Sequence, residues 1–219
     1  MKKIAIIGGT FDPIHLGHIA LIQNAQTWFA DCRIAITYCS HLKQQAAPYH
    51  HRYRMCQKAI DQEFGGKVGI MPTDHASSFM IDNLHFFHKH FPEHLFYLVL
   101  GSDCLNQIET WHRWQSLLDV CSVVIFERKG YTSKVPHLWQ SYVKKSITES
   151  RKDKFFLLNQ TKDIPKISST ECRLALKKAR KDQKTSGLAT YTRSYIDQHD
   201  LYRYKSNTAK LKKDEVVGA

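Results

Sequence analysis

The stretch Gly8-Gly9-Thr10-Phe11-Asp12-Pro13-Ile14-His15-Leu16-Gly17-His18 decides the fold of this chain. A short apolar run, Ile4–Ile7, precedes it, and the segment that follows has apolar residues at helical spacing. The order predicts a strand, a glycine-rich turn and a helix start. Gly8 and Gly9 let main-chain N–H groups approach a phosphate closely, and a helix N-terminus favours an anion. His15 and His18 are three residues apart, which places both imidazoles on one side of the first helical turn.

Two familiar phosphate-binding patterns are missing from this stretch of sequence. The dinucleotide fingerprint G-x-G-x-x-G does not occur there, and neither does the P-loop pattern G-x-x-x-x-G-K-[ST]. The turn offers two histidines where a P-loop offers a lysine. The sequence therefore predicts a phosphate site that works differently from both.

The rest of the chain alternates between apolar runs and amphipathic segments, which predicts βαβ crossovers and a parallel sheet with helices on both faces. The expected fold is α/β, a doubly wound (Rossmann-like) parallel sheet with a small C-terminal helical cap. Ligands of such a sheet bind at the carboxyl ends of its strands. The expected strands are Ile4–Ile7, Arg33–Tyr38, Val68–Met71, Leu95–Leu100, Val120–Phe126 and Phe155–Leu158, and the expected helices are His18–Phe29, Arg52–Ile60, Phe79–Phe91, Ser169–Arg180 and Leu188–Gln198.

Length and composition fit one globular domain. Of the 219 residues 42% are hydrophobic, enough for a proper core. We expect a single domain over residues 1–202, with a helical part over 167–202, and a flexible basic tail over 203–219. Monomers and small homo-oligomers both remain open.

The net charge of +12 favours anionic partners, among them nucleic acid, a membrane surface and a polyphosphate. The basic runs lack the interleaved aromatic residues of a base-stacking platform, so nucleic acid is not expected as a partner. No apolar stretch approaches the ~20 residues of a spanning helix, and no signal peptide is recognisable. Together with scattered cysteines, these features predict a cytoplasmic protein without a membrane partner.

A second candidate phosphate element is Ile167-Ser168-Ser169-Thr170-Glu171-Cys172-Arg173. Either serine can cap a helix N-terminus, where free N–H groups, hydroxyls and an arginine one turn in form an anion cradle. Glu171 is expected to face water. The thiol of Cys172 is not expected to be a nucleophile, because no histidine base is evident near it in the sequence.

The two elements together resemble the nucleotidylyltransferase superfamily. Its signature G-[TS]-F-D-P-x-H-x-G-H matches the first element, and its I-S-S-T-x-x-R motif matches the second. The resemblance implies that Thr10, His15, His18 and Arg173 are catalytic and that Mg²⁺ accompanies ATP. The ATP-binding residues that it implies are Gly8, Gly9, Thr10, Phe11, His15, His18, Ile167, Ser168, Ser169, Thr170 and Arg173.

Three further stretches resemble bacterial nicotinate mononucleotide adenylyltransferases. They are Gly101-Ser102-Asp103-Cys104-Leu105 followed by Trp111 and Trp114, the helix start Ser78–Leu84, and the ending Tyr195–Tyr202, whose role in that family is packing. An Asp at the end of a buried strand can bind ribose hydroxyls or a hydrated Mg²⁺, and a Trp can stack on a pyridinium ring. The resemblance implies mononucleotide binding by Lys43, Ser78, Met80, Gly101, Asp103 and Trp111, with Asp103 as the metal ligand and Trp114 in the core.

This sequence departs from that family at two places. Met80 and Asn83 replace two threonines of the family's S-x-T-x-D-T-L. The family's P-P-H-K is replaced by Cys39-Ser40-His41-Leu42-Lys43, in which Lys43 is the candidate phosphate lysine. The histidines near residues 85–94 are expected to face solvent rather than bind a metal.

The resemblance implies transfer of AMP from ATP to nicotinate mononucleotide, which gives deamido-NAD and pyrophosphate in NAD biosynthesis. The attacking phosphate oxygen is already anionic, so catalysis rests on positioning and charge stabilisation. Two alternatives stay open. One is another adenylyltransferase, with nicotinamide mononucleotide or phosphopantetheine as acceptor, and the other is a non-catalytic nucleotide-binding protein.

Overall fold

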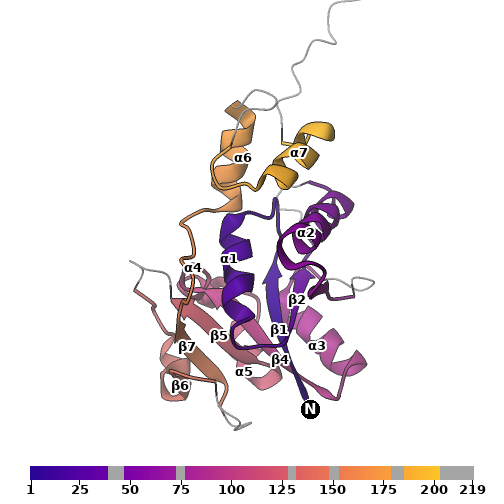
Figure 1. Cartoon of the computed structure of the whole chain (residues 1–219). Helices are drawn as coiled ribbons and strands as arrows, with labels where there is room; N and C mark the ends of the chain where they lie inside the picture. Colours follow the sequence, from indigo (N-terminus) through magenta and orange to yellow (C-terminus); the bar gives the residue numbers. More distant parts are fainter. Residues whose placement is uncertain (39–46, 73–76, 128–131, 148–152, 179–184, 203–219) are drawn as a thin grey trace, which may run out of the picture.

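A seven-stranded parallel sheet with helices on both faces forms the body of the protein (Figure 1). The computed structural model describes residues 1–38, 47–72, 77–127, 132–147, 153–178 and 185–202. The strands are β1 (Lys2–Gly9), β2 (Asp31–Ile36), β3 (Val68–Ile70), β4 (His94–Gly101), β5 (Ser122–Glu127), β6 (Val143–Lys144) and β7 (Phe155–Asn159). Their order in the sheet is β3-β2-β1-β4-β5-β7-β6, which confirms the doubly wound fold.

The helices divide between the two faces of the sheet and its carboxyl end. The longer ones are α1 (Leu16–Ala25), α2 (Tyr49–Phe64), α3 (Met80–His90), α6 (Ser169–Lys178) and α7 (Thr190–Gln198). The short ones are α4 (Ser102–Leu105), α5 (Leu117–Val120) and the 3₁₀ helices η1 (Ile108–Thr110), η2 (Trp114–Ser116) and η3 (His137–Tyr142). One buried cluster joins α1 and α2 to the sheet, and a second joins α3 and α5 to the opposite face.

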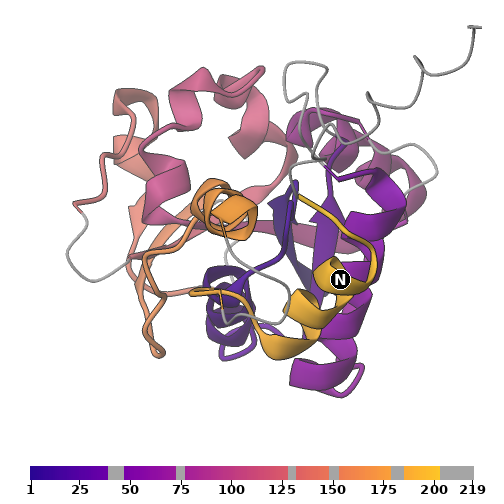
Figure 2. The same cartoon turned by 90° about the horizontal axis from the view of Figure 1, so that it is seen from above.

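The strand order reverses direction between β1 and β4, because β2 and β3 extend the sheet on one side and β5, β7 and β6 on the other. The crevice at such a reversal is where doubly wound sheets bind ligands. Helices α6 and α7 lie beyond the carboxyl end of β1, so they cover this edge as the expected cap (Figures 1 and 2).

The ends of most elements differ from the sequence prediction, and the short helices α4, α5 and η1–η3 were not predicted. Val120 ends α5, and β5 begins only at Ser122, because Cys121 donates its amide to Leu117 O and closes the helical turn. The two-residue strand β6 was not predicted, since two residues carry no readable periodicity. None of the helices in the described part of the chain is long and apolar enough to cross a membrane.

Candidate active site

The turn between β1 and α1 forms the centre of the site. Gly8 and Gly9 end β1, and Phe11 turns the chain with a left-handed φ of 49°. His15 is the N-cap residue of α1. A Cβ atom at Gly8 would lie 2.3 Å from Met80 Cε, so a side chain at this position would displace the flexible end of Met80.

The two histidines of the turn lie against each other. Their ring centroids are 3.7 Å apart in a stacked arrangement, and the His15 main-chain N–H donates to His18 Nδ1 at 3.3 Å. A ring nitrogen that accepts a hydrogen bond carries no proton, so the proton of His18 resides on Nε2. His18 also lines the cavity described below.

Helix α6 is pinned directly to this turn. Ser169 Oγ donates to Pro13 O at 3.0 Å, and Arg173 Nη1 donates to Asp12 O at 2.7 Å. Arg173 Nη2 also donates to Thr170 Oγ1 at 3.1 Å. The two phosphate elements predicted from sequence therefore lie side by side, although more than 150 residues separate them along the chain.

Ser168 starts α6 through a reciprocal capping box with Glu171. The Ser168 amide and hydroxyl both donate to Glu171 Oε2 at 2.8 Å, and the Glu171 amide donates back to Ser168 Oγ at 3.2 Å. These bonds lower the pKa of the Glu171 carboxyl. Glu171 is exposed as expected, but it also caps the helix, which the sequence reading missed despite the S-x-x-E spacing.

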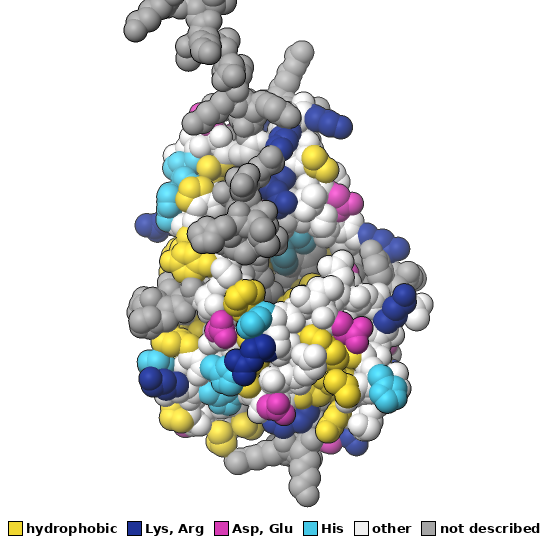
Figure 3. All heavy atoms as spheres, turned by 180° about the vertical axis from the view of Figure 1, so that it is seen from behind, with side chains coloured by type: hydrophobic (Ala, Val, Ile, Leu, Met, Phe, Trp, Pro, Cys, Tyr) yellow, Lys and Arg dark blue, Asp and Glu magenta, His cyan; other side chains and the backbone are white. Residues whose placement is uncertain are grey.

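One cavity of about 420 Å³ opens at the carboxyl end of the sheet and joins both halves of the predicted site. The view from behind shows a hollow with histidine side chains in and around it (Figure 3). The predicted residues that line the cavity are Gly8, Gly9, Thr10, His18, Ser78, Met80 and Trp111. Lining residues that were not predicted include Thr37, Phe79, Cys104, Gln107, Thr110 and His112.

Other predicted residues lie around this cavity rather than in its lining. Gly101 is buried at the end of β4, Asp103 lies in the first turn of α4, and Lys43 lies outside the described residues. Phe11 and His15 are buried in the turn, and the remaining phosphate residues belong to α6 and to Ile167 just before it.

The lining of the cavity includes an aromatic pair that the sequence did not predict. The rings of Phe79 and His112 approach to a centroid distance of 4.3 Å, and both residues line the cavity. The sequence held one indication of this pair, because each residue is next to a predicted site residue: Phe79 precedes Met80 at a helix start, and His112 follows Trp111.

Asn83 explains one departure from the family pattern. Its Oδ1 accepts from the Ser77 amide at 2.8 Å, while its Nδ2 donates to Ser77 O and Phe79 O, both at 3.0 Å. The side chain thereby holds the turn that leads into α3, whose first residues line the cavity.

Arg52 is a further residue whose role the sequence did not reveal. The side chain is only 1% exposed, and its guanidinium donates to Ala47 O at 3.1 Å, Thr10 O at 2.6 Å and Thr37 O at 2.9 Å. These carbonyls follow the carboxyl ends of β1 and β2 or precede α2, so Arg52 ties together the loops at the site.

Several other predictions can be checked. Trp114 is buried against Trp139, as predicted for a core residue. His85 and His90 are exposed as expected. His88, whose ring nitrogen bonds Val120 O, and His94, beside Glu93, are half-buried, so the prediction was wrong for these two. Among the described residues there is no group of three or more His, Cys, Asp or Glu side chains arranged to hold a metal ion.

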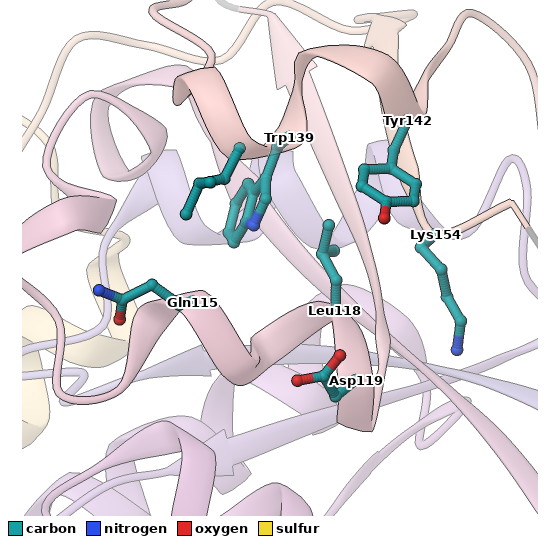
Figure 4. Close-up of a pocket in the computed structure, with 7 residues that line it drawn as sticks. Gln115, Leu118, Asp119, Trp139, Tyr142 and Lys154 are labelled. Carbon is teal, nitrogen blue, oxygen red and sulfur yellow. The ribbon is translucent and has the colours of Figure 1, made fainter.

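A second hollow, of about 550 Å³, lies between α5 and η3. Figure 4 shows Trp139 and Tyr142 of η3 facing Leu118 and Asp119 of α5. Because this hollow adjoins the amino ends of β5 and β7, it lies opposite the ligand-binding edge of the sheet. None of the predicted site residues lines it.

Comparison with protein-family models matches residues 6–175 to the cytidylyltransferase-like family, so fold and site define a protein of this class. A relative from Solibacter usitatus, named probable nicotinate-nucleotide adenylyltransferase, is 31% identical over 91% of this chain and 99% of its own length. A relative of the same name from Clostridium tetani is 31% identical over 93% and 100% of the two chains. The chain belongs to the cytidylyltransferase-like family and, within it, to the nicotinate-nucleotide adenylyltransferases.

A solved structure supports the fold independently. The chain is similar to Plasmodium falciparum nicotinic acid mononucleotide adenylyltransferase complexed with NaAD, with a TM-score of 0.72 and 24% sequence identity. The match covers 92% of this chain and 98% of that one.

Proposed function

We propose that this chain transfers the AMP part of ATP to nicotinate mononucleotide, giving deamido-NAD and pyrophosphate. The observation that carries the proposal is the shared cavity, in which the phosphate turn and His18 meet Trp111 and the start of α3. A nucleotidyl transfer requires both substrates in one space with their reacting atoms in line, and this cavity offers a phosphate side and an aromatic side. Membership of the nicotinate-nucleotide adenylyltransferases supports the choice of acceptor.

The chemistry is in-line displacement at the α-phosphorus. A phosphate oxygen of the mononucleotide is already anionic at neutral pH, so no general base is required. His18 Nε2–H and Thr10 donate to the α-phosphate, where negative charge develops. His15 orients the phosphates from the buried side. Fixed donors of this kind stabilise the transition state without reorganising during the reaction.

Residues at the start of α6 hold the leaving group. Ser169, Thr170 and Arg173 surround a helix N-terminus that adjoins the turn, and Ser168 and Ile167 lead into it. Lys43 is the further basic residue that we assign to the phosphates. The positive helix end and the guanidinium favour the charge of departing pyrophosphate.

Mg²⁺ fits this site as a companion of the phosphates. The described residues form no cage of three carboxylate or imidazole ligands, and Mg²⁺ bound through phosphates needs only one or two carboxylates. Asp103, in the first turn of α4 at the carboxyl end of β4, is the carboxylate that we assign to it or to ribose hydroxyls. When bound, Mg²⁺ neutralises charge on the leaving pyrophosphate.

The aromatic side of the cavity suits nicotinate. Trp111 stacks on the pyridinium ring, and Gly101 leaves room beside the ribose. The main-chain amides near Ser78 and Met80 at the start of α3 are N–H donors. They can donate to both oxygens of a carboxylate, whereas the NH₂ group of an amide is itself a donor and cannot accept from them. Preference for the acid follows from this arrangement.

The test is a turnover assay with ATP and three acceptors in parallel: nicotinate mononucleotide, nicotinamide mononucleotide and phosphopantetheine. We expect pyrophosphate release with both pyridine mononucleotides, and a kcat/KM roughly ten- to hundredfold higher for the acid, as an unpaired buried donor implies. Faster turnover of the amide would reverse the acceptor assignment. Turnover of phosphopantetheine alone would identify a different adenylyltransferase, and ATP binding without turnover of any acceptor would leave a binding protein.

A further inference from the structure

Asp12, the aspartate of the phosphate turn, is a buried carboxylate at a crossing of four chain segments. Only 3% of the residue is exposed. Its Oδ1 accepts from the Ala47 amide at 2.9 Å and from the Tyr202 hydroxyl at 2.7 Å. Its Oδ2 lies 3.4 Å from Arg173 Nη1, which also donates to Asp12 O. The proposed mechanism gives Asp12 and Tyr202 no task, although both contact or adjoin the phosphate-binding machinery.

We infer that Asp12 and Tyr202 are positioning residues that hold the Arg173 guanidinium toward the β- and γ-phosphates of ATP. This inference rests on the proposed function, because the proposed function is what places ATP phosphates at Arg173. It goes further in giving the tyrosine near the end of the family resemblance a polar role, where the sequence indicated packing alone.

The hydrogen bonds around Asp12 fix which oxygen faces the arginine. Two donors, from Ala47 and Tyr202, engage Oδ1. The carboxylate therefore cannot rotate freely, and Oδ2 and the main-chain oxygen remain on the Arg173 side. Without the Tyr202 hydroxyl, the carboxylate would be free to turn toward Arg173 and form a two-pronged pair, the geometry that guanidinium and carboxylate prefer.

The other edge of the guanidinium is also held, because Nη2 donates to Thr170 Oγ1 at 3.1 Å. Arginine has five N–H donors in a planar fork, and these contacts engage only part of Nη1 and Nη2. The side chain keeps 24% of its surface exposed, so the remaining donors are accessible to a ligand. A pre-oriented arginine loses less entropy on binding a phosphate than one that must first be ordered.

Tyr202 is suited to this task by its surroundings. Burial and the neighbouring Asp12 carboxylate raise the pKa of its hydroxyl, so it remains a donor at every physiological pH. The residue has a left-handed φ of 63°, a conformation that a bulky side chain adopts only when its surroundings hold it. The contact with Asp12 joins residues 190 positions apart.

The test measures the affinity of the full-length protein for ATP with Mg²⁺ and for AMP, without any mononucleotide. Tyr202→Phe should weaken ATP binding about five- to tenfold, the loss typical of one hydrogen bond, and leave AMP binding unchanged. AMP has no β- or γ-phosphate for Arg173 to contact. In turnover, KM for ATP should rise by a similar factor while kcat changes less.

Tyr191→Phe is the matched control, because Tyr191 Oη also donates to a carboxylate, Glu63 Oε1 at 3.1 Å, but in a solvent-exposed bond between α7 and the last turn of α2. It should leave both affinities unchanged. In an Arg173→Ala background, Tyr202→Phe should cause no further loss for ATP, since its effect passes through that arginine. Asp12→Asn serves as a second variant, and it should show the same loss of affinity for ATP and no loss of affinity for AMP.

Three results would overturn the inference. The first is an unchanged ATP affinity in folded Tyr202→Phe, and the second is an equal loss of affinity for ATP and for AMP. The third is a Tyr202→Phe effect on ATP affinity as large in the Arg173→Ala background as in the wild-type protein. Because these measurements need no acceptor, they are separate from the proposed function. Failure of the wild-type protein to adenylylate nicotinate mononucleotide would reject that function while the ATP-binding comparison still decided the roles of Asp12 and Tyr202.

Discussion

The two halves of the site are built in different ways. On the phosphate side, the turn after β1 is held by directional hydrogen bonds to main-chain atoms from distant segments, through Arg52, Ser169 and Arg173. On the mononucleotide side, Met80, Phe79, Trp111 and their neighbours shape a partly apolar cavity mainly by packing. The phosphate side therefore holds hydrogen-bond donors at fixed positions, whereas the mononucleotide side is defined by the shape of its cavity.

This difference accounts for one of the two places where the sequence departs from its family. The motifs of the turn and of α6 match in full, while Met80 and Asn83 stand where the family has threonines. The other departure, over residues 39–43, lies outside the described residues. A donor aimed at a phosphate has few substitutes, because distance and angle both matter. A cavity wall tolerates another side chain of suitable volume, and Asn83 even supplies its own hydrogen bonds to the Ser77–Phe79 turn.

The largest effect is expected from the two stacked histidines. His15→Ala and His18→Ala should each lower kcat by roughly 10²–10³, the usual loss for one donor to a developing charge, with a smaller change in substrate affinity. Steady-state kinetics with both substrates would show this. His85→Ala, on the exposed face of α3, is the control and should leave kcat unchanged. Near-normal kcat in both site variants would refute the mechanism.

A smaller effect, confined to ATP, is expected from Arg173→Ala. Loss of a charged hydrogen-bonding group should raise KM for ATP about ten- to hundredfold and leave KM for the mononucleotide nearly unchanged. Lys178→Ala, on the exposed last turn of the same helix, removes a positive charge without touching the turn. If both variants raised KM for ATP alike, general charge rather than a placed guanidinium would explain ATP binding.

Gly187, which precedes α7, connects this end of the chain to the start of α1, because its carbonyl accepts a hydrogen bond from the Leu16 amide at 2.9 Å. It has φ +87°, and a Cβ there would lie 2.7 Å from Ile167 Cγ2. Gly187→Ala should lower the free energy of unfolding in urea by about 1–3 kcal/mol. Gly66→Ala is the control, because Gly66 has φ +75° but open space around it. An equal loss in both would mean that the Ile167 contact contributes nothing.

The smallest effect is expected on the mononucleotide side. Met80→Thr should raise the ratio of kcat/KM for the acid over the amide by less than about tenfold, the value of one added hydrogen bond to a carboxylate. The ratio cancels any general loss from the void beside Gly8. Met80→Leu keeps the volume without a hydroxyl and should leave the ratio unchanged. A ratio that moves equally in both variants would make cavity shape, rather than the hydroxyl, the source of discrimination.

The sequence by itself determined the parallel sheet, the phosphate turn after β1 and the α6 start. These features are local: Gly8 and Gly9 follow a buried strand, two histidines share one helical turn, and Ser168 precedes a helix. Periodicity and turn chemistry of neighbouring residues encode them. The buried runs also predicted every strand longer than two residues, with small errors at their ends.

Only the tertiary structure decided how these pieces combine. The sequence predicts only that Arg52 lies in a helix, but its side chain is buried and donates to three carbonyls. The sequence predicts a packing role for Tyr202, but its hydroxyl donates to Asp12. The Phe79–His112 pair likewise joins a helix start to a loop that follows another strand. Such contacts depend on where the chain brings distant residues, and a hydrogen bond between residues 190 positions apart leaves no periodicity in the sequence around either partner.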